Sequence, residues 1–139
     1  MIKHVEEKDK AAWYTLDHDL PEDQFEEKVR NRQGYVCMNG DTIIGILRYN
    51  LFWDHIPFCT KLFIDEAYRG RGYGKLLMEF WERDMRFAGF DMVMTSTQVD
   101  EEAQHFYRSL GYRDSGGFSV DVPGHEQPME LILIKALSK

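Results

Sequence analysis

Seven consecutive residues combine glycine with positive charge in a pattern that suits an anion. They are Arg69, Gly70, Arg71, Gly72, Tyr73, Gly74 and Lys75. The apolar run Leu62, Phe63 and Ile64 precedes them and predicts a strand, and the amphipathic segment 76–88 that follows predicts a helix. The first N–H groups of a helix lack partners, the helix dipole adds positive charge there, and glycine lets the backbone approach a ligand. The pattern therefore predicts an anion site, and a phosphate group fits it well.

Two common nucleotide motifs do not fit these residues. A P-loop requires Gly at position 69 and Ser or Thr at position 76, where this chain has Arg69 and Leu76. The dinucleotide fingerprint G-x-G-x-x-G fails from Gly70 because Lys75 occupies its last position, and from position 72 because a leucine does. What remains is R-x-x-G-x-G. A surface turn that is merely rich in glycine and arginine is the alternative interpretation.

Length and charge narrow the classes of function. The chain has 139 residues, which predicts one domain over residues 1–139. With 17 basic and 24 acidic residues its net charge is -7, which argues against a general nucleic-acid binder. We expect a cytoplasmic protein without a membrane segment, because the sequence shows neither a signal peptide nor a run of roughly 20 apolar residues. Cys37 and Cys59 are expected to be reduced, buried thiols.

Periodicity and turn residues predict an alternation of strands and helices. Asn39-Gly40-Asp41 between apolar runs predicts a type I′ hairpin with Asn39 and Gly40 at positive φ. Gly34 is expected to end the second helix, and Asp100 to cap the fourth. Strand, helix and strand between 58 and 96 predict a parallel pair with a right-handed crossover. The expected strands are 2–6, 35–38, 42–47, 58–64, 92–96, 112–120 and 129–137, and the expected helices are 8–18, 21–33, 76–88 and 100–110.

The predicted helix after the glycines has two distinct faces. Its apolar residues lie three and four positions apart, so one stripe should face a sheet. On the opposite face the i,i+4 pairs Glu79–Arg83 and Glu82–Arg86 are expected. The stripe consists of Tyr73, Leu76, Leu77, Phe80, Trp81, Met85 and Ala88.

A second sequence motif lies downstream. It consists of Asp100, Ala103, Phe106, Tyr107, Gly111 and Tyr112. Together with R-x-x-G-x-G, this group resembles the GNAT N-acetyltransferase family over residues 62–112. The order of elements resembles that family from about 34 to 137. The resemblance implies an α/β fold with a mixed, mostly antiparallel central sheet of about six or seven strands. It also implies a splayed parallel pair formed by strands 4 and 5, and about four helices on both faces.

The resemblance implies acetyl-CoA as the acetyl donor. Residues 69–75 would hold its pyrophosphate, and the backbone of Leu62, Phe63 and Ile64 would bind the pantetheine amides and polarise the thioester carbonyl. Tyr107 would protonate the leaving thiolate, whereas a buried ring with a satisfied hydroxyl is the structural alternative. Asp100 would contact the cofactor, although it replaces the usual Asn and cannot donate a hydrogen bond when ionised. Some members carry a glutamate base where this chain has Thr95.

An acceptor amine must lose a proton before it attacks. The candidate bases are Asp65, Glu66, Asp54, His55 or a chain of water molecules. No metal is expected, because Glu101 and His105 form a possible pair without an evident third ligand. The leading hypothesis is an enzyme that transfers acetyl directly to a primary amine in a ternary complex. The alternatives are a non-catalytic acyl-CoA sensor and a nucleotide-phosphate binder. The acceptor stays open, and exposed strands could support a homodimer.

Overall fold

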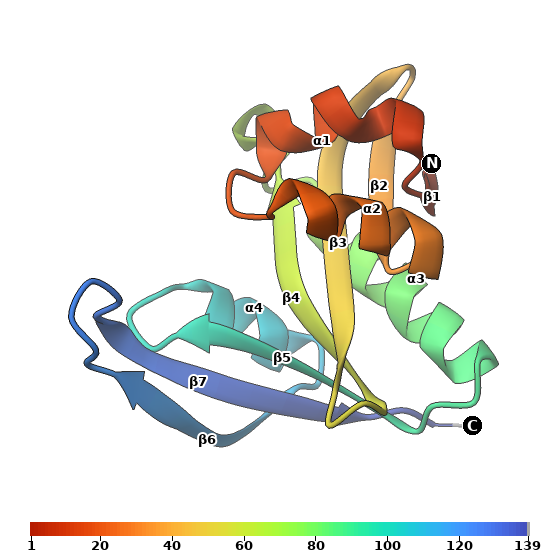
Figure 1. Ribbon diagram of the computed structural model, residues 1–139. Helices are drawn as coiled ribbons and strands as arrows, with labels where there is room; N and C mark the ends of the chain where they lie inside the picture. The colour runs from red at the N-terminus through yellow and green to blue at the C-terminus, as the bar shows by residue number, and fades with distance from the viewer. Residues whose placement is uncertain (139) are drawn as a thin grey trace. The chain divides into compact units, whose positions relative to one another are not determined.

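The computed structural model describes residues 1–138 of the chain. Figure 1 shows how its strands and helices follow one another. The strands are β1 (Ile2–His4), β2 (Gly34–Asn39), β3 (Thr42–Phe52), β4 (Ile56–Ile64), β5 (Met92–Gln98), β6 (Arg113–Val120) and β7 (Gln127–Ala136). The α-helices are α1 (Lys10–Leu16), α2 (Glu22–Asn31), α3 (Tyr73–Phe87) and α4 (Ala103–Ser109), and the short 3-10 helices are η1 (Glu7–Asp9) and η2 (Glu66–Tyr68).

The strands form a seven-stranded sheet in the order β1-β2-β3-β4-β5-β7-β6. The pairs β1–β2, β2–β3, β5–β7 and β6–β7 are antiparallel, and β4 and β5 are parallel. Among residues 1–138 this confirms the predicted mixed, mostly antiparallel sheet with four α-helices. The chain divides into two compact units: a first unit of Met1–Asn50 and Cys59–Asp84, and a second unit of Leu51–Phe58 and the described residues from Met85 onward.

The first unit has helices on both faces of its strands, with α1 and α2 on one face and α3 on the other (Figure 1). Trp13 and Phe25 pack with Val36 and Ile46 in the core between α1, α2 and the strands, so Phe25 lies on the inward face of α2. Toward α3, a Cβ on Gly45 would lie only 2.7 Å from Ile64 Cδ1. The absence of a side chain at Gly45 therefore lets the end of β4 pack closely under the helix. Cys37 and Cys59 are both buried, as expected.

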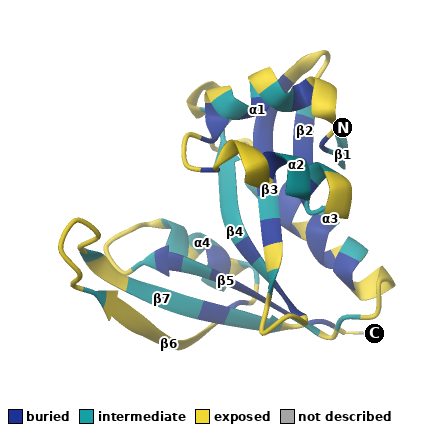
Figure 2. Ribbon diagram, viewed as in Figure 1, coloured by how far each residue is buried: buried dark blue, intermediate teal, exposed yellow. Residues whose placement is uncertain are grey.

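In the second unit, α4 packs against β5 (Figure 1). Thr95 and Asp114 both pair with Leu133, which is fully buried. The β6–β7 register shifts between Asp114 and Gly117. A Cβ on Gly117 would lie 2.4 Å from Glu130 O, so only glycine allows this close approach of the two backbones. Figure 2 shows that β6 is exposed along most of its length.

Two predicted turn details are wrong. The second helix ends at Asn31, followed by Arg32 at φ 55, and not at Gly34. Gly34 instead begins β2, where a Cβ would lie 2.8 Å from Val5 Cγ1. In the first hairpin Asn39 pairs with Thr42, so the two turn residues are Gly40 and Asp41. Only Gly40 has positive φ, at 61, which fits a type II′ turn and not type I′.

The boundaries and faces of two helices also differ from expectation. Leu76 of α3 is 52% exposed, whereas Met78 and Glu82 are buried, so Glu82 does not lie on the solvent face. Because successive helical residues are rotated by about 100°, the packed face shifts toward positions 77, 78, 81, 82 and 85. Asp100 does not cap α4, whose N-cap is Glu102. Residues between β5 and α4 form a turn in which Glu101 Oε1 accepts the Gln98 N–H at 3.1 Å.

Candidate functional site: a glycine turn and a buried phenol

The glycine turn belongs to the first unit and connects β4 to α3. Asp65 Oδ1 accepts the Ala67 N–H at 3.0 Å and caps η2, after which Gly70 and Gly72 take φ values of 75 and 88. The Leu76 N–H then donates to Gly72 O at 3.0 Å, closing the first turn of α3. The N–H groups of residues 73–75 precede this bond and therefore have no acceptor within the helix.

Backbone conformation, and not lack of space, requires the two glycines. A Cβ on Gly70 or on Gly72 would meet no atom within 4 Å. Their φ values lie in the left-handed region, which costs other residues roughly 1–2 kcal/mol. The space beside both glycines is thus open, next to the amides at the start of α3 that have no acceptor within the helix. This arrangement has the geometry and the dipole that anions prefer.

The three cations of the turn behave differently. Arg71 lies over the Tyr68 ring, with Cζ 5.5 Å from the ring centre. Arg69 is folded back onto β4: its Nε donates to Ile64 O at 2.9 Å, and its Cζ lies 4.9 Å from the centre of the Phe63 ring. The Arg69 side chain is therefore engaged with β4. Lys75 is exposed in the first turn of α3.

Leu62, Phe63 and Ile64 are the last three residues of β4, and all three are half-buried. The next amide, Asp65 N–H, donates to Ile44 O at 2.7 Å and ties the end of β4 to β3. The strand that the sequence predicts as the pantetheine-binding strand thus leads directly into the glycine turn.

A buried charged network supports β4 and is invisible in the sequence, because its members are far apart in the chain. Asp17 Oδ2 accepts from Trp13 Nε1 at 3.1 Å and from Arg48 Nε at 2.8 Å, and Arg48 Nη1 donates to Thr60 Oγ1 at 3.1 Å. Burial alone raises the pKa of Asp17, but the hydrogen bond and charge of Arg48 outweigh it, and the pKa is lowered. Asp17 therefore stays ionised while fully buried.

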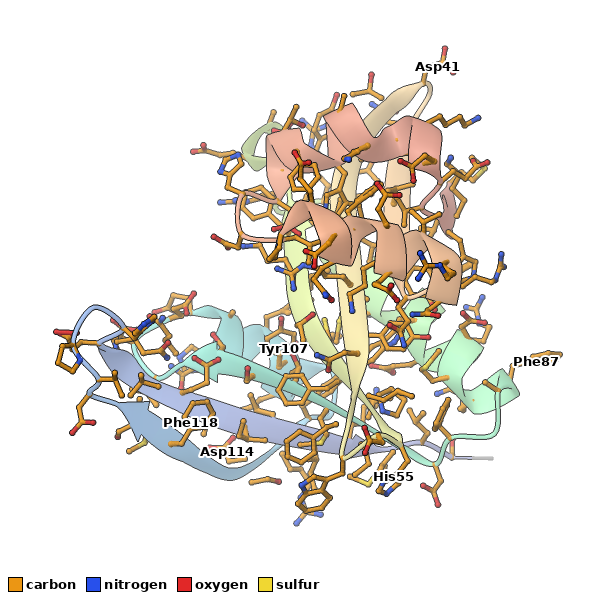
Figure 3. All side chains as sticks on the ribbon, viewed as in Figure 1. Asp41, His55, Phe87, Tyr107, Asp114 and Phe118 are labelled. Carbon is orange, nitrogen blue, oxygen red and sulfur yellow. The ribbon has the colours of Figure 1, made fainter. Side chains whose placement is uncertain are left out.

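Tyr107 belongs to the second unit, where it lies on α4 (Figure 3). Its side chain is 6% exposed, and its ring centre lies 5.8 Å from that of Tyr112 and 5.4 Å from that of Phe106. Arg108 joins α4 to β6 through two hydrogen bonds to Asp114, at 2.9 and 3.0 Å. The phenol is thus held by aromatic packing on a helix that is fastened to the sheet at its surface.

The structure does not identify which of the candidate bases would accept the proton of the amine. Asp65 is engaged in capping η2, and Glu66 is exposed beside it. Asp54 and His55 lie in the β3–β4 turn of the second unit, where Figure 3 labels His55. His55 Nδ1 lies 2.7 Å from Trp53 O, and because a carbonyl only accepts, Nδ1 is the donor and Nε2 is left with the lone pair in the neutral ring.

The described residues contain neither a cluster of metal-ligand side chains nor a helix suited to cross a membrane. Among residues 1–138, no three His, Cys, Asp or Glu side chains lie together so as to hold a metal ion. His105, considered above as one half of a possible metal pair with Glu101, contacts Arg108 and Glu102. In the same part of the chain, no helix combines the length and apolar character that a membrane span requires. The expectation that the protein uses no metal stays a prediction.

The fold is shared with known N-acetyltransferase structures. The ribosomal-protein-S18-alanine N-acetyltransferase from Escherichia coli matches with a TM-score of 0.83 at 18% identity, covering 100% of this chain and 94% of that chain. Ard1 from Thermoplasma volcanium matches with a TM-score of 0.87 at 15% identity, covering 100% and 98%. Arabidopsis thaliana Naa50, in complex with the bisubstrate analogue CoA-Ac-MVNAL, matches with a TM-score of 0.83 at 14% identity, covering 97% of each chain. No curated protein matches the sequence.

The sequence itself matches a family model over residues 2–112, a range that contains β1 through α4, the glycine turn and Tyr107. That model describes the acetyltransferase (GNAT) family, in agreement with the resemblance of the two motifs. The chain belongs to the GNAT acetyltransferase family.

Proposed function

We propose that this protein is an N-acetyltransferase that moves the acetyl group of acetyl-CoA to a primary amine by direct attack in a ternary complex. The observation that carries the proposal is the glycine turn, where Gly70 and Gly72 at positive φ leave the first amides of α3 open to an anion. The known structure of Naa50 with a CoA-containing bisubstrate analogue supports acetyl-CoA as the donor.

The pyrophosphate of CoA is the anion that the turn binds in this proposal. Hydrogen bonds to charged groups contribute roughly 1.5–3 kcal/mol each, and the N–H groups of residues 73–75 supply about three of them. After the cost of immobilising a flexible ligand, this total is compatible with a micromolar complex, near about -8 kcal/mol. Arg71 and Lys75 add positive charge at the rim of the turn, where both side chains are exposed.

In the chemical step, the backbone of residues 62–64 binds the pantetheine amides and polarises the thioester carbonyl. The neutral amine attacks the acetyl carbon, so that a C–N bond forms and the C–S bond breaks. The proton lost by the amine passes to a base or to water, and Tyr107 gives its proton to the departing thiolate. A phenol suits this role because its proton moves as the sulfur gains charge. Asp100 is exposed beside α4 and contributes to cofactor binding as an acceptor only.

The amino group of a peptide N-terminus is the acceptor that deserves the first test. The Escherichia coli structure is named for acetylation of an alanine of a ribosomal protein, and the Naa50 ligand contains a peptide. The net charge of -7 on this chain also favours the approach of a cationic amine.

The test is a panel of amines incubated with acetyl-CoA, with release of free thiol followed by absorbance and acetylated product identified by mass. Peptides with different N-terminal residues, lysine peptides, polyamines and small-molecule amines form the panel. We expect thiol release above the enzyme-free rate with at least one class. If CoA binds but no amine in the panel stimulates thiol release, the protein is an acyl-CoA sensor and not an enzyme.

A further inference from the structure

We propose that Arg69 is a positioning residue that fastens the glycine turn to the end of β4, and that it does not contact phosphate. This inference rests on the proposed function, because it concerns how the turn and the strand bind one CoA molecule together. Arg69 Nε donates to Ile64 O at 2.9 Å, and its guanidinium lies over the Phe63 ring at 4.9 Å. One side chain thus closes the short loop that separates β4 from the glycine turn.

The two contacts direct the guanidinium toward the strand. Phe63 packs against the core cluster of the first unit, so the surface that receives Arg69 is itself held in place. Lys61, two residues earlier on β4, lies 5.9 Å from the same ring and donates to Asp19 Oδ2 at 2.9 Å. Arg69 therefore contacts a segment of β4 whose side chains are themselves held by packing and by hydrogen bonds.

Arg71 provides the contrast within the same turn. Its guanidinium lies over Tyr68 of η2, a residue of the connection itself, whereas that of Arg69 lies over Phe63 of β4. A cation carried by the connection is suited to meet a phosphate directly. A cation bound to a strand carbonyl is suited to set the distance between the turn and the strand.

That distance matters because the two regions bind different parts of one ligand. In the proposed complex, the turn holds the pyrophosphate and residues 62–64 hold the pantetheine. If their spacing is fixed before CoA arrives, both parts bind without a further ordering cost. Loss of the Arg69 contact should therefore weaken CoA without removing a charge–phosphate interaction.

The test compares Arg69→Gln with Arg69→Leu, because glutamine keeps an N–H donor near Ile64 O but removes the charge. The dissociation constant of CoA is measured by calorimetry at several salt concentrations, with Arg71→Gln as the control for a phosphate contact. We expect Arg69→Leu to weaken CoA by about tenfold, as loss of a charge-assisted hydrogen bond implies. Arg69→Gln should stay within about threefold of wild type. The salt dependence should be unchanged in both and reduced in Arg71→Gln, since screening acts on the charge–phosphate interaction.

A double-mutant cycle gives a second readout. If Phe63 is the surface that holds Arg69, the losses of Phe63→Leu and Arg69→Leu should not add in the double variant. The inference is overturned if Arg69→Gln is as weak as Arg69→Leu and reduces the salt dependence as Arg71→Gln does. It is also overturned if Arg69→Leu binds CoA as wild type does. Failure of the wild-type protein to bind CoA is a different result, which would refute the proposed function and this inference with it.

Discussion

The starts of α3 and α4 serve the proposed function by different means. α3 begins after two glycines at positive φ, and its first amides are open while the nearby side chains are exposed. α4 begins at Ala103, after the N-cap residue Glu102, which makes no side-chain cap; the helix has seven residues and carries the buried Tyr107. The first region works through its backbone, so most of its side chains can change with modest effect. The second works through one side chain, so loss of the Tyr107 hydroxyl group should abolish its contribution to turnover.

The two regions also differ in the ion pair that lies next to each of them. Beneath β4, the Asp17–Arg48 ion pair is buried, with side chains 0% and 12% exposed. On α4, the Arg108–Asp114 pair lies at the surface, with side chains 36% and 49% exposed. A buried pair becomes costly when one partner is removed, whereas an exposed pair contributes little.

Replacing Tyr107 by Phe should have the largest effect on activity. Loss of a general acid lowers turnover by about 10²–10⁴-fold, whereas CoA affinity should stay within about twofold because the ring still packs against Tyr112. Steady-state kinetics and CoA calorimetry on the same sample check both parts. Equal turnover in Tyr107→Phe would mean that the phenol is only a packed ring.

Asp17→Asn should have the largest effect on stability. It leaves the Arg48 guanidinium buried without its counter-charge, which typically costs about 3–5 kcal/mol. Urea unfolding measures the loss. Asp19→Asn, two residues away, removes an exposed carboxylate that pairs with Lys61 and serves as the control with little change. Comparable losses in the two variants would contradict the buried-network account.

The same carboxylate predicts how stability depends on pH. The folded-state pKa of Asp17 is lowered, so its contribution is fully present above the unfolded pKa of about 3.9 and is lost as pH falls through the folded value. The free energy of unfolding of wild type should therefore decrease more steeply below about pH 4 than that of Asp17→Asn. Denaturant titrations at several acidic pH values compare the two slopes; parallel slopes would argue against an ionised Asp17.

Gly72→Ala should weaken CoA by about tenfold, because an alanine at φ 88 costs roughly 1–2 kcal/mol and distorts the turn. Gly124→Ala is a matched control, since Gly124 has φ 87 and, like Gly72, has space for a Cβ. Both variants should lose similar stability in thermal unfolding, and only Gly72→Ala should lose CoA affinity in calorimetry. If Gly124→Ala lost as much CoA affinity as Gly72→Ala, the loss could not be attributed to the glycine turn.

The smallest effect is expected at the surface pair of α4. Asp114→Asn removes the partner of Arg108 but leaves both groups in water, so the urea midpoint should stay within experimental error. Turnover should be retained as well, because the aromatic packing of Tyr107 remains. A marked fall in turnover would show that the Arg108–Asp114 contact positions the phenol. The exposed pair on α4 would then matter to function, contrary to the contrast drawn with the buried Asp17–Arg48 pair.

The sequence was most informative where a local rule decides the structure. The apolar run, the glycines and the amphipathic segment correctly located β4, the turn and α3, because each depends on neighbouring residues. The Asp17–Arg48 pair could not be predicted, since its partners are 31 positions apart in the sequence. The positive φ of Trp53 and Asp54, at 52 and 67, was also missed, because residues other than glycine, and tryptophan above all, rarely adopt that conformation. Asp100 was wrongly assigned as a cap, because residues before α4 form their own turn.

The central claim is that the backbone of residues 69–75 binds the pyrophosphate of CoA. Its most direct test is thermal unfolding of the wild-type protein with CoA and, separately, with ATP at the same concentration. At about 100 times the dissociation constant, a ligand that binds only the folded state stabilises it by about 2.7 kcal/mol. We predict a clear rise in the unfolding midpoint with CoA and little change with ATP. No rise with CoA, or an equal rise with ATP, would contradict the claim.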